Sequence, residues 1–175
     1  MRPFNDDGLK FIRSSTQDLL NTSHTVHIYG KQSRGADKNT KDQKVLLKTV
    51  EQPRYFSHYV MNLPATAITF LPSFIGLYSS LSDTLGSDID LEKLPLPMVH
   101  VYAFSTKSED NVAQSQELCE EAMRQLGMPL DGNEKIEPGV AETEVWDVRD
   151  VAPKKRMFCL SFRLPKSVAW RNHKP

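Results

Sequence analysis

The spacing of apolar and polar residues predicts alternating strands and helices through the middle of the chain. Runs rich in β-formers predict strands over Tyr55–Met61 and Met98–Phe104, and the second is continuous enough for a central strand. Apolar residues at helical spacing predict helices over Ala65–Leu81 and Asn111–Leu126. Pro72 should bend or split the first helix, because it lacks a backbone donor and crowds the preceding turn.

The two ends of the chain add further elements. Phe4–Asp7 is typical of the end of a strand, and a short helix is expected to follow it until Asn21. His24–Tyr29 fits a short strand or an extended loop. Glu144–Val151 and Met157–Leu164 alternate on either side of a Pro-Lys-Lys turn, which predicts a β-hairpin. The whole pattern predicts an α/β domain with a mostly parallel sheet that ends in an antiparallel hairpin.

Three local features complete the predicted layout. Asn111 is expected to cap the helix that follows it, and Gly127 to end it. Ser82–Pro97 is predicted to be a loop. Gly30–Lys48 is polar and rich in lysine without apolar periodicity, so we predict a mobile basic insertion at residues 30–48. This insertion is either a loop that touches phosphates or simply a solvated surface loop.

Composition excludes several classes of function. Lys+Arg and Asp+Glu both total 22, so no global basic field points to nucleic acid, and such a partner must meet a local patch. Cys119 and Cys159 lie far apart and show no metal or disulfide spacing, and the five histidines show no zinc spacing. We therefore expect no metal site. No apolar run approaches the roughly 18 residues that a bilayer requires, so no membrane partner is expected.

The strongest candidate site is Asn62-Leu63-Pro64-Ala65, between a predicted strand and a predicted helix. Open α/β sheets bind ligands at the carboxyl ends of their strands. The amide of Asn62 both donates and accepts hydrogen bonds, so it can hold the edge of a flat nitrogen heterocycle. Asn is also a favoured helix cap, and the spacing alone leaves site and cap equally open.

Two weaker candidates stand at either end of the chain. Asn5-Asp6-Asp7-Gly8 can place a carboxylate against the amino group of an adenine, or can form a turn or helix cap. The segment from Arg149 to Arg156 gathers four cations, Arg149, Lys154, Lys155 and Arg156, around the hairpin turn. These cations are either contacts to an RNA backbone or the charges of a solvated turn.

Three stretches of the sequence are similar to one known family, in the family's order and over nearly the whole chain. The chain resembles the carboxyl-terminal part of fungal tRNA (guanine37-N1)-methyltransferases. The stretches that carry the resemblance are Phe4-Asn5-Asp6-Asp7-Gly8-Leu9-Lys10-Phe11-Ile12, His58-Tyr59-Val60-Met61-Asn62-Leu63-Pro64-Ala65 with the following Phe70-Leu71-x-Ser73-Phe74, and Val148-Arg149-Asp150-Val151-Ala152-Pro153-Lys154-Lys155.

The resemblance implies a class I, Rossmann-like fold that uses S-adenosylmethionine to methylate N1 of guanosine 37 of tRNA. Asp7 would contact the adenine of this cofactor, with Asn5 nearby, and Asn62 would hold the guanine beside the methyl donor. The implied tRNA contacts are Pro64, Arg149, Lys154 and Lys155. We expect a monomer in the cytoplasm, with the nucleus and the mitochondrial matrix as alternatives.

The chain also departs from the family's pattern. It has no glycine-rich strand–turn for the methionine end of the cofactor, no acidic ribose contact, and none of the family's upstream Glu and Arg. Pro72 replaces a helix-compatible residue. We therefore expect residues 1–175 to be a partial catalytic domain that is inactive alone. The alternatives are a non-catalytic RNA-binding remnant of the fold and a related wybutosine-pathway transferase.

Overall fold

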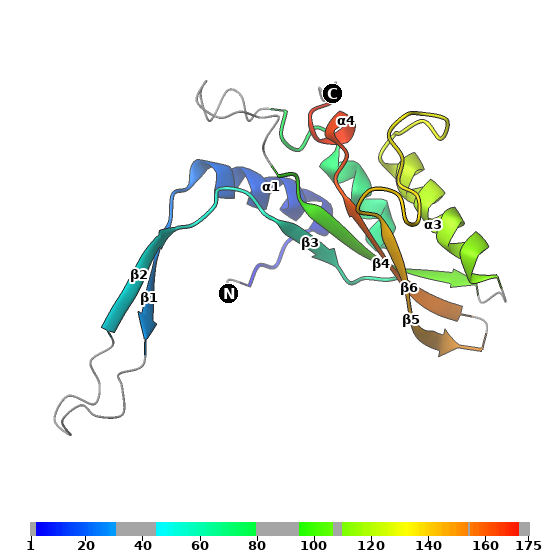
Figure 1. Ribbon diagram of the computed structural model, residues 1–175, viewed down its shortest axis with the longest axis horizontal. Helices are drawn as coiled ribbons and strands as arrows, with labels where there is room; N and C mark the ends of the chain where they lie inside the picture. Colours follow the sequence, from blue (N-terminus) through cyan, green and yellow to red (C-terminus); the bar gives the residue numbers. More distant parts are fainter. Residues whose placement is uncertain (1–2, 31–44, 80–94, 107–109, 154, 172–175) are drawn as a thin grey trace.

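The computed structural model describes residues 3–30, 45–79, 95–106, 110–153 and 155–171. A four-stranded sheet forms its centre, with β3 (His58–Met61), β4 (Met98–Thr106), β6 (Lys155–Arg163) and β5 (Glu144–Ala152) lying side by side in that order. A separate two-stranded hairpin of β1 (Thr25–Gly30) and β2 (Val45–Glu51) projects away from it (Figure 1).

The sheet mixes parallel and antiparallel pairs. β3 and β4 are parallel, whereas β6 is antiparallel to both β4 and β5. The predicted mixed α/β fold, the interior position of β4 and the closing hairpin are thus confirmed. The expectation of a mostly parallel sheet is wrong for the described strands. Only the long β3–β4 connection returns the chain in the same direction, while the hairpin strand β6 inserts beside β4.

Asp7 caps helix α1 (Gly8–Asn21). Its Oδ1 accepts hydrogen bonds from the amides of Leu9 and Lys10 at 3.0 and 3.2 Å. The buried side chains of α1 recur every four residues at Ile12, Thr16 and Leu20. The predicted helix is therefore confirmed. The residues before it are not in a strand, so the predicted strand end at Phe4–Asp7 is wrong, and Asp7 is a helix cap in this structure.

The predicted helix over Ala65–Leu81 is a short 3-10 helix, η2 (Ala67–Phe74), within the described part of the chain. Pro72 lies inside it, and the amide of Ile75 donates to the Pro72 carbonyl oxygen at 3.2 Å, three residues back. Pro72 has no amide hydrogen to donate in an α-helix. The segment therefore forms hydrogen bonds between residues three apart, as in a 3-10 helix. The helix continues through Pro72 to Phe74, so the expected split at the proline is wrong.

Helix α3 (Asn111–Gln125) has the predicted extent, but its cap is different. Asp110 is the capping residue, and its Oδ1 accepts from the amide of Ala113 at 2.9 Å. Asn111 is the first helical residue instead. Gly127 ends the helix as predicted, with a φ of 62° that favours glycine. A short helix that the pattern did not predict, α4 (Lys166–Ala169), follows β6.

The core lies between one face of the sheet and the helices α1, η2 and α3 (Figure 1). Alternate strand residues point into it and are almost completely buried, including Tyr59, Val99, Val101, Phe158, Leu160 and Phe162. The residues between them point to the opposite face. That face has no helix over it among the described residues, and we call it the open face.

The predicted insertion at residues 30–48 is only partly described. Gly30 ends β1, and Val45–Lys48 belong to β2, so the prediction that no regular structure forms there is wrong for these positions. The alternating β-formers of His24–Tyr29 and Val45–Val50 pair with each other, which a search for single strands does not reveal. Residues 31–44 and most of the predicted loop Ser82–Pro97 lie outside the described residues.

Candidate functional site

A cavity of about 970 Å³ lies between α1 and the outer edge of β3, and we call it the α1–β3 groove. One wall comes from α1 and the segment before it, with Phe4, Gly8 and Phe11, and the other comes from the end of β3, with Asn62 and Leu63. The Asn5–Gly8 and Asn62–Pro64 segments are far apart in sequence. The structure brings Gly8 of the first segment and Asn62 and Leu63 of the second to this one cavity.

Asn62 follows directly after β3 and is exposed, as its position in the groove requires. The residue at the cap position of η2 is Thr66, and the amides of Thr66 and Ala67 both donate to the carbonyl oxygen of Leu63. No side chain caps this helix. Within the described part of the chain, the Asn62 amide makes no hydrogen bond, so the cap interpretation is wrong.

Asn5 and Asp7 precede the groove residue Gly8 in the chain but are not among the residues that line the groove. Asn5 is exposed, and Asp7 is exposed with its Oδ1 engaged in the helix cap. The carboxylate of Asp6 accepts from the amide of Asp7 at 2.8 Å. The turn-or-cap interpretation is thus correct for Asp7. Contact with an adenine stays a prediction. The second carboxylate oxygen of Asp7 could accept the hydrogen bond that this contact requires.

One row across the open face connects the Asn62 segment with the hairpin. The amide of Phe104 donates to the Pro64 carbonyl oxygen at 3.1 Å. Phe104 pairs with Met157 across β4 and β6, and Met157 pairs with Arg149 across β6 and β5. Neighbouring strands lie about 4.8 Å apart, so Arg149 is roughly 10 Å from Phe104 across the sheet. Pro64 is therefore fixed at one end of the register row that has Arg149 at its other end.

Lys155 joins this row from the beginning of β6. Its Nζ lies 4.3 Å from the centroid of the Phe104 ring, a cation–π contact. Arg149 is exposed on β5. Lys154 lies outside the described residues. The structure thus brings two of the predicted tRNA contacts, Lys155 and Arg149, toward the loop that holds a third, Pro64.

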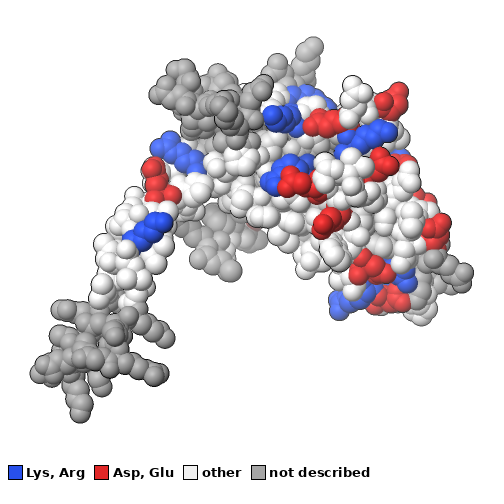
Figure 2. Space-filling view, in the orientation of Figure 1, with Lys and Arg blue, Asp and Glu red and all other residues white. Residues whose placement is uncertain are grey.

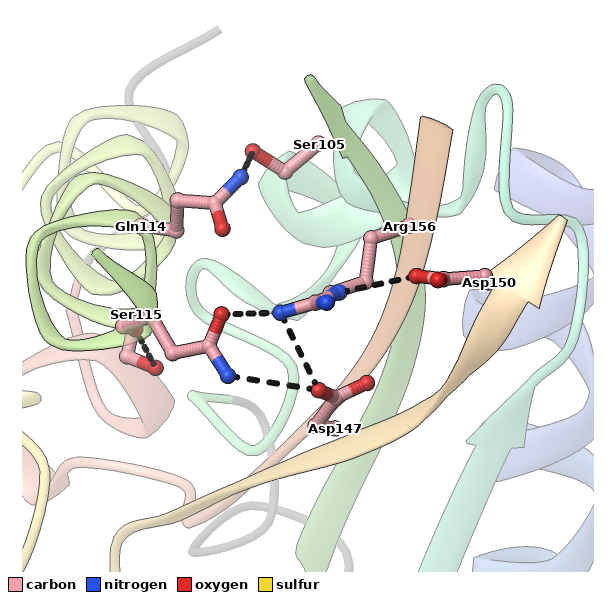
Figure 3. Close-up of polar contacts among 7 residues, drawn as sticks. Ser105, Gln114, Ser115, Asp147, Asp150 and Arg156 are labelled. Atoms are coloured by element: carbon pink, nitrogen blue, oxygen red, sulfur yellow. Dashed lines mark hydrogen bonds and ion pairs between the residues drawn. The ribbon is translucent and has the colours of Figure 1, made fainter. Parts of the chain in front are cut away.

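Arg156, the fourth cation of the hairpin segment, serves the fold instead (Figure 3). Its guanidinium forms ion pairs with Asp150 at 3.0 Å and Asp147 at 3.3 Å, and it also donates to the side-chain oxygen of Asn111. Its side chain is only 15% exposed. Arg156 lies on the helix-covered side of the sheet, because Arg149 and Lys155 point to the open face. For Arg156, neither a contact to RNA nor a solvated charge describes its place in the structure.

A histidine pair on the open face was not predicted. Nδ1 of His58 lies 3.0 Å from Nε2 of His100, the two rings stack, and Nδ1 of His100 lies 2.8 Å from the Ser161 hydroxyl. Burial, and then the nearby His58, lower the pKa of His100. His58 is two residues before Val60, and His100 is two residues before Tyr102, so strand alternation places both histidines on the open face. This alternation was the signal in the sequence that could have predicted the pair.

The described residues show no broad charged patch, no metal-ligand cluster and no membrane-spanning helix. Figure 2 shows basic and acidic side chains interspersed on the visible face, without a broad field of one sign over the described residues. Among these residues, no three His, Cys, Asp or Glu side chains gather as metal ligands. None of the described helices has the length and apolar character needed to cross a membrane.

Comparison with curated proteins identifies relatives that are methyltransferases. The mixed α/β fold of this chain is consistent with a methyltransferase fold. Each is named tRNA (guanine(37)-N(1))-methyltransferase. The Phaeosphaeria nodorum relative is 49% identical over 174 residues, which is 97% of this chain and 38% of the relative. The Neurospora crassa relative is 41% identical over 97% of this chain and 34% of its own length.

The chain is thus a homologue of one part of the fungal tRNA (guanine(37)-N(1))-methyltransferases, and the predicted resemblance is confirmed. A Candida albicans relative extends the relationship, at 35% identity over 99% of this chain and 39% of the relative. The chain spans somewhat more than a third of the length of these relatives. No family model matches it, and no solved structure does.

Proposed function

We propose that this chain forms part of a tRNA (guanine37-N1)-methyltransferase that uses S-adenosylmethionine, in a class I, Rossmann-like fold. The observation that supports this most is the position of Asn62. Its amide has no hydrogen bond within the described residues and opens into the α1–β3 groove at the carboxyl end of β3, where α/β folds bind ligands. The activity given in the relatives' names supports the same proposal.

The amide of Asn62 suits the edge of a guanine base. Its carbonyl oxygen can accept from a ring or exocyclic N–H, and its NH₂ group can donate to O6 as negative charge develops there. An amide does not take up a proton near neutral pH, so Asn62 orients the base and does not deprotonate N1. Pro64, fixed through its carbonyl to Phe104, holds the exit of the loop rigid.

The residues around the groove fit an adenosine-bearing cofactor in part. The exposed Asp7 carboxylate has one oxygen in the helix cap, so its other oxygen can accept from an adenine amino group, with Asn5 beside it. Phe4 and Gly8 line the adjoining wall. S-adenosylmethionine, when bound, supplies an electrophilic methyl group. We propose that the tRNA lies over Arg149, Lys154 and Lys155.

The substitution Asn62→Ala tests this proposal. Methyl transfer to a tRNA transcript is measured with radioactive S-adenosylmethionine, using the chain alone and the chain with the part of the Phaeosphaeria nodorum relative that it does not match. We expect a loss of transfer of at least about 100-fold, the scale of one lost transition-state donor. The free energy of unfolding should change by less than about 0.5 kcal/mol, because no internal bond is lost.

Asn133→Ala is the matched control, since Asn133 is an exposed asparagine in a loop outside the groove. It should leave both methyl transfer and stability unchanged. Equal transfer by the Asn62→Ala and Asn133→Ala proteins, or a loss of transfer that follows a loss of folding, would contradict the proposed role of Asn62.

A non-catalytic RNA-binding module is the second candidate, and the open face favours it. Phe104 with Lys155 above its ring, and Arg149 in the same row, combine an aromatic surface with cations, as many RNA-binding surfaces do. Calorimetry with S-adenosylmethionine distinguishes the two functions. Binding of tRNA by a folded protein that takes up no cofactor, even with the remainder of the relative present, favours the module.

A further inference from the structure

The ring of Phe104 lies near the carboxyl end of β4, on the open face. Phe104 is half-buried and follows the alternation of the buried Val101 and Ala103, so its ring points away from the helices. Its amide donates to the carbonyl oxygen of Pro64, which is only two residues after Asn62. Because consecutive Cα atoms are about 3.8 Å apart, the Cα atoms of Asn62 and Phe104 are separated by at most about 14 Å.

Asn62 belongs to the same side of the sheet. Val60 is 66% exposed on the open face, and the buried Met61 separates it from the exposed Asn62. Strand alternation, carried one residue past β3, therefore places Asn62 on the side of Val60 and Phe104. A guanine held by Asn62 would then have the Phe104 ring within reach of its neighbouring nucleotide.

Two exposed cations accompany this ring. Nζ of Lys155 lies 4.3 Å from the centroid of the Phe104 ring. Arg149 lies in the same register row, beyond Met157. Among the described residues neither cation forms an ion pair, in contrast to Arg156. An aromatic ring beside exposed cations suits single-stranded RNA, whose bases stack on rings while its phosphates pair with Lys and Arg.

The contact between Lys155 and the ring can be exchanged for contacts with RNA. A cation–π contact at an exposed site is weak, and a lysine side chain is long and flexible. A phosphate near the hairpin would attract the ammonium group, and the ring would then be open to a base. An enzyme that acts on a base takes this base out of the stack, so the neighbouring base loses its stacking partner.

We propose that the ring of Phe104 stacks on the base next to the target guanosine, while Lys155 and Arg149 pair with the flanking phosphates. The ring replaces the stacking partner that this base loses when the guanine moves to Asn62. Phe104 is then a substrate-binding residue that sets tRNA affinity and takes no part in moving the methyl group. The inference rests on the proposed methylation of tRNA and adds to it a site for the adjacent nucleotide.

Filter binding with altered tRNA transcripts tests the proposal. One transcript is intact, and two others each lack the base on one side of the target guanosine. The protein is the chain together with the part of the Phaeosphaeria nodorum relative that it does not match. Phe104→Leu keeps an apolar side chain and the amide that holds Pro64. We expect this variant to bind the intact transcript about tenfold more weakly, the scale of one lost stack.

The transcripts without a base separate stacking from a merely structural role. For one of them, Phe104→Leu should weaken binding by less than about twofold, because the partner of the ring is already missing. The same transcript should bind the unmodified protein about tenfold more weakly than the intact one, a comparison that needs no protein variant. Kinetics of methyl transfer should show a KM for tRNA that rises about tenfold in Phe104→Leu, with kcat nearly unchanged.

Tyr29→Leu is the matched control, because Tyr29 is an aromatic residue of the projecting hairpin and is 52% exposed. It should bind all three transcripts as the unmodified protein does. Phe104→Trp keeps an aromatic ring and should retain binding of the intact transcript. Thermal unfolding followed by circular dichroism verifies that each variant folds.

Three results would overturn the proposal. These are intact binding by Phe104→Leu, equal weakening by Phe104→Leu for all three transcripts, and a Phe104→Trp protein that binds as weakly as Phe104→Leu. The expected binding pattern without any methyl transfer would contradict the proposed function and leave the stacking site supported. Methyl transfer with a KM that does not depend on Phe104 would support the function and contradict the stacking site.

Discussion

The amide of Phe104 donates to the carbonyl oxygen of Pro64 at 3.1 Å, and this bond fastens the Asn-Leu-Pro loop to the central strand. The ring of the same Phe104 carries Lys155 on its face. One residue therefore holds the loop that presents Asn62 and also fixes a cation of the closing hairpin. Two of the three segments that resemble the family are thus linked through Phe104, a residue outside both.

The exposed cations of the row should contribute to tRNA affinity through its phosphates. We expect Arg149→Ala and Lys155→Ala each to weaken tRNA binding and to lower the slope of log affinity against log salt by about 1, since each removes one phosphate contact. Filter binding at several salt concentrations measures this with the chain and the remainder of the relative together. Lys135→Ala, an exposed lysine in a distant loop, should leave the slope unchanged.

Arg156 should matter for stability far more than its neighbour Arg149. Arg156→Ala removes two ion pairs and the bond to Asn111, and we expect the free energy of unfolding to fall by about 2 kcal/mol. Arg149→Ala should cost less than about 0.5 kcal/mol, because Arg149 is exposed. Urea unfolding of both variants gives the comparison. Equal losses would show that the Arg156 contacts contribute nothing specific.

The hydroxyl of Tyr59 holds α1 to the sheet. It lies 2.7 Å from the Thr16 hydroxyl in the buried space between α1 and β3. Tyr59→Phe leaves the Thr16 hydroxyl without this partner, so we expect unfolding to become easier by about 1 kcal/mol. Tyr29→Phe is the control, since Tyr29 is half exposed on the projecting hairpin. A Tyr59→Phe protein as stable as the Tyr29→Phe protein would contradict this.

The histidine pair should make stability depend on pH. Burial and the nearby His58 lower the pKa of His100 in the folded chain, so the unfolded chain binds the proton more readily. Stability should therefore fall as the pH drops through the ordinary histidine pKa of about 6.5, and level off below the folded pKa. Urea unfolding between about pH 7.5 and pH 5 measures the change. The His100→Gln protein should lose less stability over that range.

Local patterns predicted most elements of this fold, and the errors have physical causes. Helical spacing correctly located α1 and α3, because both bury one face. The strand end predicted at Phe4–Asp7 does not form, and the carboxylate of Asp7 caps α1, as the alternative interpretation of this residue allowed. Only long-range contacts define the parallel pairing of β3 and β4 and the insertion of β6, so the direction of the sheet was not predictable from single segments.

The sequence named candidate site residues but did not reveal the contacts that connect them. The structure places Asn62 on the α1–β3 groove and removes the cap interpretation that the spacing left open, while its contact with a guanine stays a prediction. Phe104 was taken simply as part of a buried strand, although alternation places it on the open face with His100. Arg156 looked like a free cation, because Asp147 and Asn111 approach it only in the folded chain.

The contacts of Arg156 tie three elements into one cooperative unit. The arginine belongs to β6, its carboxylate partners to β5, and its amide partner to the first turn of α3 (Figure 3). An edge strand that would otherwise fray can separate only when the helix end is also released. Amide protons of β5 and of the first turn of α3 should then exchange with solvent at similar rates. The backbone positions of Arg149 and Lys155 should stay fixed relative to the rest of the sheet.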